Sequence, residues 1–496
     1  MRPLQINGSF SSFPHISTAA FVIDKLDMSQ EAAVDGVELS PSGKNSDFGY
    51  RIMKTVALFL CWCCLGLYAE VLGPSMQTYI DVTNSDTEQL GTCLSLRELG
   101  MFFGSLMGAF LADRFVQWRH FVVAGGLVLG AATIGAVPWC TTVASLSATF
   151  FFSGYAHGTM TASGNPLLNS IWLEKSGGPF NFMHSGYGVG GAVAPGLLAP
   201  FTFAQEKALA NGTIVKNRLI SLTAPYLIVG GLCCVCACLF CSFCFCQPSK
   251  EETPEASTAK DEDSSSTEEF GDPKVEVKKF ALLQALAAQQ RVLLYIIVPI
   301  FLLYAALVGN ERVFSKYLFV FANEGPAHLP ESDCFLLNSV YWIVFALARI
   351  ATVPISLVVP LPILFTLQLV GAWAMALGLY LAPANRTVYL AFTACFGFFK
   401  SPLFPTGLGV VSLASPVTGI IIFFVNLGSS VGASVLQAVG GIVLNRQGRQ
   451  AFPLLVMISA LALIFIGAGL ITTTYFYRRR HRPNPGPEPG GAGLSA

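Results

Sequence analysis

The sequence predicts an all-α polytopic membrane protein, with about twelve transmembrane helices arranged as two six-helix bundles. Composition is the first reason: 53% of the 496 residues are hydrophobic and 12% are charged, whereas soluble domains carry roughly 25% charged residues. The second reason is that apolar runs of membrane-spanning length follow one another from residue 53 to residue 477. The third is a single long polar interruption at residues 247–290, which divides these runs into two similar sets.

The domains follow from these runs. Residues 1–50 are polar and read as a disordered cytoplasmic tail, followed by an N-terminal bundle at 51–246. The acidic linker at 247–290 cannot bury enough apolar surface to fold alone, and a C-terminal bundle at 291–477 precedes a tail at 478–496. We expect the spans at 53–79, 88–111, 120–140, 145–170, 181–203, 221–246, 291–321, 334–358, 361–382, 387–410, 416–442 and 452–477.

Basic residues predict the orientation. They gather in the segments that face the cytoplasm if both termini are inside, above all in the cluster at 478–482, as the positive-inside rule requires. The first 50 residues contain no short apolar core with a cleavage site, so we expect no cleaved signal peptide. The sequons at Asn211 and Asn385 then fall outside and are candidate glycosylation sites.

Several function classes are excluded. A net charge of zero and the lack of a basic patch with interleaved aromatics argue against nucleic-acid binding. The sequence has no nucleotide-binding loop, nucleophile motif or metal-ligand spacing, so we expect neither an enzyme nor a cofactor. Half of the 14 cysteines lie between Cys233 and Cys246 with no histidine nearby, which favours packing, lipid contact or palmitoylation over a soft-metal site. Because the sequence has no nucleotide-binding loop, the energy for any transport must come from solute or ion gradients.

The stretch from Leu96 to Arg119 combines packing and charge. Glycines at 100, 104 and 108 lie on one helix face, where they allow a second helix to approach closely. Arg97 and Glu98 are costly in an apolar run unless they have partners, and because adjacent helical residues diverge, we expect one to face a cavity and the other a neighbouring helix. Asp113 and Arg114 form a charged inner end. These charges are predicted to have gating or structural roles.

Glu70 lies midway along the first predicted helix. It is a candidate to bind a co-transported sodium ion or carry a proton, and a structural ion pair with Arg97 is the alternative. Gln77 lies two turns further on the same face. Its amide can both donate to and accept from a sugar hydroxyl, although hydrogen bonding at a helix end is an equal alternative.

Polar residues also mark the fourth and fifth predicted helices. Asn165 precedes Pro166, with Asn169 one turn on, and we expect the proline to interrupt the helix where it lines a cavity. Two amides at a bend suit a polyol ligand, while a simple kink is the competing interpretation. His184 stands in a glycine-rich stretch, where it would bond a hydroxyl or relay protons unless packing alone satisfies it.

The second half carries its own charged candidates. Glu311 is a second candidate for ion coupling, and Arg349 would pair with it or line the inner exit. Lys316 lies further out. The alternative to a functional role is that its side chain snorkels to the membrane surface. Lys400 is an amine beside Pro402, where we expect broken helix geometry.

Two further residues of this half are candidates for substrate contact. Trp342 offers a ring face to the apolar side of a sugar, although aromatic residues at this density usually serve packing. Asn426 offers a side-chain amide for substrate contact from the second half of the chain.

The chain also resembles the major facilitator superfamily. Leu111-Ala112-Asp113-Arg114, followed by Arg119, is similar to the signature loop of that family, with Val116-Gln117 in place of its usual glycine-arginine pair. More specific are three stretches that, with Arg97 and Arg349, resemble the sodium-dependent glucose transporter 1 type, also called the major facilitator domain-containing protein 4 group: residues 71–77, residues 164–195, and residues 311–322.

The resemblance implies a plasma-membrane hexose transporter, with sodium as a candidate co-transported ion and no other cofactor. Its partners would be a small-molecule solute and membrane lipid, without nucleic acid, and we expect a monomer. A facilitative or proton-coupled carrier of another small polar solute is the alternative. A non-transporting receptor or scaffold is the alternative from another class.

Overall fold

The structure is a computed structural model that describes residues 41–172, 177–208, 214–245, 293–382, 384–415 and 419–480. Contacts divide the chain into two units, Met1–Ile52 and Met53–Ala496. The account below concerns the second unit, which holds the helical bundle. The predicted linker at 247–290 and the tail beyond residue 480 lie outside the described residues.

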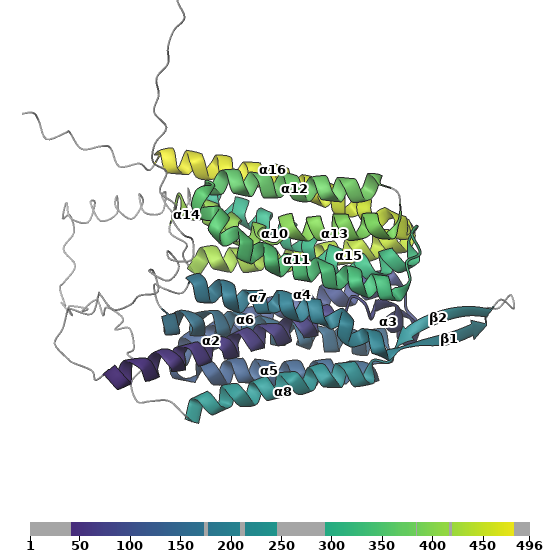
Figure 1. The fold of residues 1–496 in the computed structure, drawn as a ribbon, viewed down its shortest axis with the longest axis horizontal. Coiled ribbons are helices and arrows are strands. Elements are labelled where there is room, and N and C mark those ends of the chain that lie inside the picture. Colours follow the sequence, from purple (N-terminus) through teal and green to yellow (C-terminus); the bar gives the residue numbers. More distant parts are fainter. Residues whose placement is uncertain are drawn as a thin grey trace, which may run out of the picture. The chain divides into compact units, whose positions relative to one another are not determined.

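Among the described residues, the first half of the bundle has seven α-helices and a two-stranded hairpin. They are α2 (Pro41–Glu70), α3 (Met76–Thr83), α4 (Thr87–Arg114), α5 (Arg119–Ala136), α6 (Val143–Trp172), α7 (Gly177–Leu198) and α8 (Thr223–Phe245), with strands β1 (Thr202–Ala208) and β2 (Ile214–Ile220) between α7 and α8. The strands pair antiparallel, from Thr202 opposite Ile220 to Ala208 opposite Ile214. We call the end of the bundle from which β1 and β2 project the hairpin end (Figure 1).

In the second half, the part that the structure describes has seven α-helices. They are α10 (Val298–Glu324), α11 (Glu331–Val358), α12 (Leu361–Leu381), α13 (Arg386–Lys400), α14 (Leu403–Ser412), α15 (Gly419–Arg446) and α16 (Phe452–Arg480). In the described part of the chain, ten helical segments are long and apolar enough to cross a membrane. Helices α6 and α7 run beside them but are richer in Gly, Ser, Thr and Asn. The architecture confirms the predicted helical membrane fold.

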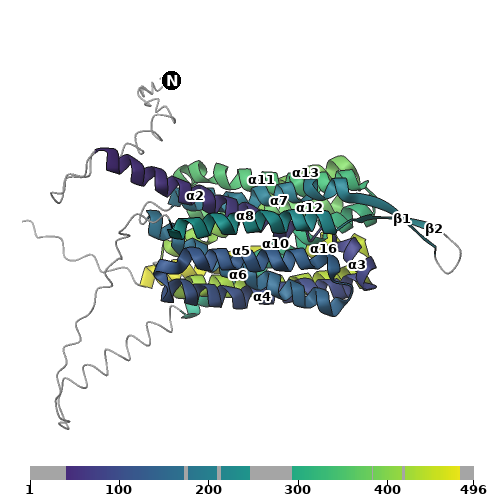
Figure 2. The same cartoon turned by 90° about the horizontal axis from the view of Figure 1, so that it is seen from below.

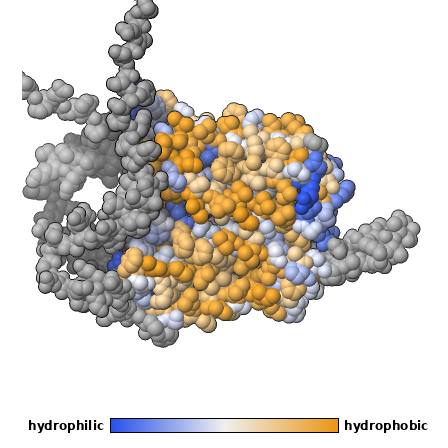
Figure 3. All heavy atoms as spheres, in the orientation of Figure 1, coloured by the Kyte–Doolittle hydropathy of each residue, from blue (hydrophilic) through white to orange (hydrophobic). Residues whose placement is uncertain are grey.

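Hydrophobic residues cover much of the flank of the bundle, as expected for a surface that faces lipid (Figure 3). Helices α5 and α8 lie side by side in both ribbon views, along the lower edge of the bundle in Figure 1 and across its middle in Figure 2.

Two predicted spans are broken, and one predicted break is absent. The first span ends at Glu70, where a turn over residues 71–75 leads into α3, so Glu70 lies at a helix end and not midway along a helix. The tenth span is divided between Lys400 and Leu403, next to Pro402. In contrast, α6 continues as a helix through Pro166, so the predicted interruption at Asn165-Pro166 is wrong. The hairpin of β1 and β2 was not predicted.

The predicted glycine face of α4 packs against α6. A Cβ atom at Gly100, Gly104 or Gly108 would overlap the backbone of Phe151, Tyr155 or Thr159, respectively. The two backbones therefore lie in contact, which is how small residues allow helices to associate without a hydrophobic driving force.

Glycines also bring two helices of the C-terminal half into contact. A Cβ atom at Gly432 or Gly428 of α15 would overlap the carbonyl of Ala305 or Phe301 of α10.

One tyrosine in each half bonds a carbonyl of another helix. The hydroxyl of Tyr68 in α2 donates to the carbonyl of Ser153 in α6. Tyr304 in α10 stands in Leu303-Tyr304-Ala305, which matches Leu67-Tyr68-Ala69 of the first half, and it donates to a carbonyl at the start of α14 over 2.5 Å. These matched bonds agree with an internal repeat of the two halves.

Candidate functional site

The two halves meet at a buried carboxylate. Glu70 lies at the end of α2 and is 3% exposed. Its two oxygens are 3.2 Å from a terminal nitrogen of Arg312 and 2.8 Å from Nζ of Lys316, both on α10. The hydroxyl of Tyr187 on α7 donates to the same carboxylate over 2.9 Å. Three helices from both halves therefore converge on one side chain, which we call the Glu70 network.

The cations of the network make further bonds across the same interface. Lys316, whose side chain is fully buried, donates to the carbonyl of Ala69 over 2.6 Å. Arg312 donates to the Tyr187 hydroxyl over 2.5 Å, and its guanidinium lies 5.5 Å from the centre of that ring. The alternative that Lys316 snorkels to the membrane surface is wrong, because its ammonium has a buried partner in the other half. The predicted alternative of a Glu70–Arg97 pair is also wrong.

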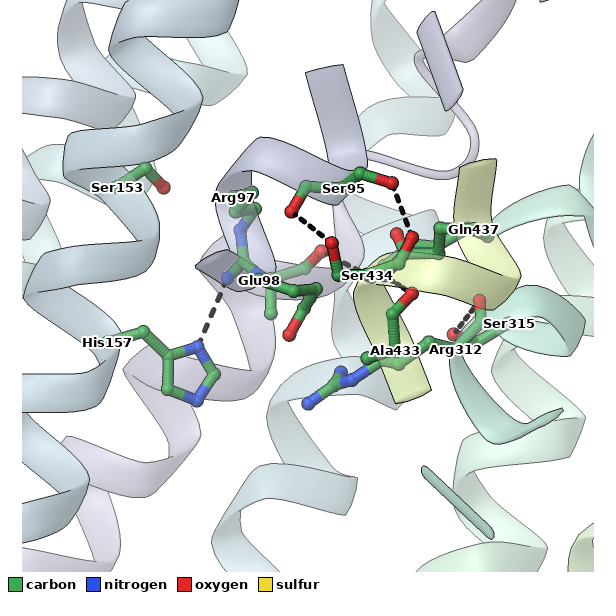
Figure 4. Close-up of polar contacts among 12 residues, drawn as sticks. Ser95, Arg97, Glu98, Ser153, His157, Arg312, Ser315, Ala433, Ser434 and Gln437 are labelled. Atoms are coloured by element: carbon green, nitrogen blue, oxygen red, sulfur yellow. Dashed lines mark hydrogen bonds and ion pairs between the residues drawn. The ribbon is translucent and has the colours of Figure 1, made fainter. Parts of the chain in front are cut away.

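A second charged group lies deeper in the N-terminal half. Arg97 and Glu98 of α4 pair over 3.0 Å and are almost fully buried. Arg97 also bonds Nδ1 of His157 over 3.1 Å, and its guanidinium lies 5.3 Å from the ring centre of Tyr68. In Figure 4 the side chains of Arg97 and His157 point toward one another, and Arg312 approaches from the other half. Arg97 thus faces a neighbouring helix, as expected for one of the two residues, while Glu98 pairs with Arg97 and not with a different partner.

Serine side chains extend the contact between the halves toward the hairpin end. Ser95 of α4 donates to the carbonyl of Ser434 in α15, and Ser434 donates back to the carbonyl of Ser95 over 3.1 Å (Figure 4). At the hairpin end itself, Arg446 forms two bonds of 2.8 and 3.1 Å to Glu88. Helices α4 and α15 are thus joined by direct polar bonds from mid-bundle to the surface.

The predicted amide contacts are dispersed. Gln77 and Asn165 are half-buried, and each has a side-chain oxygen that is buried without a hydrogen-bond partner in the described part of the molecule. Asn169 and Asn426 are exposed. Gln77 and Asn165 therefore keep hydrogen-bonding capacity that a ligand or water could use.

His184 and Trp342 lie in aromatic surroundings. His184 accepts a hydrogen bond of 3.2 Å from the indole of Trp62 and stacks on Phe180. Trp342 is almost fully buried, with its ring edge-on to Tyr187 at 5.4 Å between centroids. A Cβ atom at Gly191 would meet the Trp342 ring at 2.9 Å, so this tryptophan fills the interface between α7 and α11.

Glu311 and Arg349 do not form the predicted direct pair. Glu311 is 9% exposed and makes no ion pair within the described ranges, although its charge acts on Arg349 and on Lys400. The Nε of Arg349 instead donates to the carbonyl of Ser401 over 3.4 Å. The charge of Arg349 also acts on His184, which links this group to the fifth predicted helix.

The remaining predicted residues lie on the surface or outside the description. Asp113 and Arg114 are exposed at the end of α4, where the Arg114 guanidinium lies 5.8 Å from the ring centre of Phe115. Asn385 is exposed and caps α13 by accepting from the amide of Val388 over 2.9 Å. Asn211 lies outside the described residues.

Sequence reasoning missed Tyr187 and the roles of Arg312 and Lys316 as partners of Glu70. Two basic residues one turn apart in an apolar run were the available signal. Within the ranges the structure describes, no group of three His, Cys, Asp or Glu residues is placed to hold a metal ion. The thiols of Cys64 and Cys236 contact each other at 3.5 Å between α2 and α8, which is consistent with packing.

Residues 58–435 match the family model described as the Major Facilitator Superfamily. The chain is 25% identical over 399 residues to the sodium-dependent glucose transporter 1 of Homo sapiens, covering 76% of this chain and 71% of that protein. It is 23% identical over 430 residues to the protein of the same name from Danio rerio, covering 83% of this chain and 67% of that protein. It is also 22% identical over 467 residues to the major facilitator superfamily domain-containing protein 4A of Mus musculus, covering 84% and 91%.

Solved structures share the fold. The nucleoside transporter NupG matches with a TM-score of 0.56 at 14% identity, over 85% of this chain and 98% of that chain. The peptide transporter POT in complex with alafosfalin matches with a TM-score of 0.59 at 12% identity, over 86% and 95%. At these identities the likeness concerns the arrangement of the helices.

Proposed function

This chain belongs to the Major Facilitator Superfamily, and from that premise we propose that it moves a hexose such as glucose by alternating access, with sodium as the coupled ion. It is a multi-pass membrane transporter and not an enzyme. The names of its relatives support the choice of a hexose and of sodium. We place the transporter in the plasma membrane, as a monomer with both termini in the cytoplasm.

The Glu70 network is the observation that carries this proposal. Burying one carboxylate and two cations costs free energy that hydrophobic residues of similar volume would not cost. Here the three charges come from opposite halves and hold each other. Such a contact stabilises one arrangement of the halves and can be exchanged for solute contacts in another, as rocking of one bundle against the other requires.

In this proposal the solute binds beside the network, between the halves. Gln77 and Asn165 would accept hydrogen bonds from sugar hydroxyls, because the side-chain oxygen of each has no partner among the described residues. His184, Asn169, Trp342 and Asn426 are the further contact candidates. Glu70 or Glu311 would hold the driving cation, and Glu311 is the better placed because its carboxylate makes no ion pair within the described ranges.

Purified protein in liposomes tests the proposal. An inward sodium gradient should drive uptake of labelled glucose, and a proton gradient alone should not. The variant Glu311→Gln should lose sodium stimulation, while Asp86→Asn, which replaces an exposed carboxylate with another residue able to cap α4, should keep it. If no labelled hexose is taken up faster than into protein-free liposomes, the proposal is ruled out.

The alternative is a facilitative or proton-coupled carrier of another small polar solute. One observation favours it: both oxygens of Glu70 are engaged by protein donors in this conformation, which leaves no free ligand there for a sodium ion. Glucose uptake that ignores sodium would select this alternative. A panel of solutes with no protein-dependent flux would select a receptor or scaffold.

A further inference from the structure

A second charged cluster lies within the C-terminal half. It consists of Glu311 on α10, Tyr341 and Arg349 on α11, and Lys400 at the end of α13. Lys400 is 1% exposed and Tyr341 is fully buried, while Arg349 is half-buried. We call these four residues the Lys400 cluster.

Packing brings together the helices that carry the two cations. Helix α13 packs against α11, because a Cβ atom at Gly397 would meet the Tyr341 carbonyl at 3.0 Å. One turn on, the Ser401 hydroxyl donates to the carbonyl of Phe345 over 2.5 Å, and the Ser401 carbonyl accepts from Nε of Arg349 over 3.4 Å. Lys400 directly precedes Ser401 in the chain. The Arg349 guanidinium lies over the Phe345 ring, 4.9 Å from its centre.

The donors of this cluster are not used up. In the part of the chain that the structure describes, Nζ of Lys400 and the hydroxyl of Tyr341 are buried without a hydrogen-bond partner. Of the Arg349 nitrogens, Nε alone has a bond among the described residues. A buried polar group left without a partner costs roughly 1–3 kcal/mol and more when it is charged, so these donors indicate that a group is bound here at some stage of function.

The charges define what that group must be. Glu311 supplies one negative charge against the two positive charges of Arg349 and Lys400, and it acts on both without pairing directly with either. The cluster therefore has a formal excess of one positive charge. A single carboxylate supplies one negative charge and accepts from a planar guanidinium through two parallel bonds.

We propose that Arg349, Lys400 and Tyr341 bind the carboxylate of an anionic solute, so that the transporter takes a hydroxylated organic acid, such as a sugar acid, in addition to a neutral hexose. This rests on the proposed function, since it assumes that a solute reaches the space between the halves. The half-buried Arg349 guanidinium is the first contact, and the buried Lys400 and Tyr341 complete the site.

Binding to the purified full-length protein tests this directly. Melting temperatures are compared in sodium glucuronate, in glucose and in sodium chloride, with sodium matched throughout. Glucuronate should stabilise at concentrations at least tenfold lower than glucose or chloride. Lys400→Met should abolish the difference between glucuronate and glucose, and Lys400→Arg should keep it. Arg386→Gln, which removes an exposed positive charge paired with Asp333, should bind like the unmodified chain.

The outcomes are separable. Stabilisation by glucose alone, with glucose uptake intact, would overturn the anion site and leave the proposed function standing. Equal stabilisation by chloride and glucuronate would assign the cluster to an inorganic anion and overturn the organic acid. A Lys400→Arg variant that folds but loses the glucuronate response while Lys400→Met keeps it would also overturn the assignment. Failure of every solute both to bind and to be transported would count against both proposals.

Discussion

The Glu70 network and the Lys400 cluster contain the same formal charges, one carboxylate and two cations, in opposite states. In the first, each oxygen of Glu70 has a cationic partner within 3.2 Å, and the partners come from the other half of the bundle. In the second, all members belong to one half, and Glu311 makes no ion pair among the described residues. The comparison teaches that buried charge in this bundle occurs in two settings: a closed network joins the halves, whereas the open cluster within one half is the site that we propose for a ligand.

The largest expected effect comes from breaking the closed network. Replacing Glu70 with Ala leaves Arg312 and Lys316 buried without their shared partner, and removing one member of a buried pair typically costs about 3–5 kcal/mol. We expect a strong fall in the thermal stability of purified protein, and a smaller fall for Glu70→Gln, which keeps the bond from Tyr187. A Glu70→Ala protein that melts within a degree of the unmodified chain would contradict the closed network.

Packing at the α4–α6 seam is expected to be the next most sensitive feature. In Gly104→Ala the new Cβ overlaps the Tyr155 carbonyl, and overpacking of this kind costs about 1–3 kcal/mol. Gly125→Ala is the matched control, because nothing lies within 4 Å of a Cβ at that position. Thermal melts of both variants measure the difference. Equal melting temperatures would mean that the contact between α4 and α6 adjusts to the added methyl group without a loss of stability.

A substitution in the Lys400 cluster is expected to change the stability of the protein in the opposite direction. Lys400→Met removes a buried cation that lacks a direct partner, and replacing such a charge with an apolar side chain is often neutral or stabilising. We expect the ligand-free protein to gain about 1 kcal/mol and to lose its response to glucuronate. A clear loss of stability in ligand-free Lys400→Met would indicate that the amine is already satisfied, and that the two clusters do not differ in kind.

The sequence was sufficient for the fold and insufficient for the pairing. Hydropathy and the long acidic interruption predicted a two-part helical membrane protein, and the glycines at 100, 104 and 108 predicted a close helix contact, which is confirmed at α6. Glu70 was recognised as a costly charge, but its partner Arg312 lies 242 positions away. Several basic residues could have satisfied it, and no local pattern distinguishes among them.

The errors have the same origin. Snorkelling was an open alternative for Lys316 because it lies toward the outer end of its predicted helix, yet its amine is held inside by the other half. Pro166 was expected to interrupt a helix, but residue-level propensity is a weak guide where neighbouring helices hold the backbone in place. Burial by the opposite half depends on tertiary structure. The sequence could therefore identify candidate residues of the site, but not which of them contact one another.

The smallest expected effect concerns the exposed contact between the same two halves. Arg446 and Glu88 form a two-bonded pair at the hairpin end, but solvent and salt screen exposed pairs, so they contribute little to stability. We expect Glu88→Gln to lower the melting temperature by about 1 °C or less at low salt, and the difference should vanish in high salt. The same salt should leave the effect of Glu70→Ala nearly unchanged, because buried pairs are screened much less. If salt erased both effects alike, the Glu70 network would have to be open to water, and the distinction between a closed and an open cluster would fall.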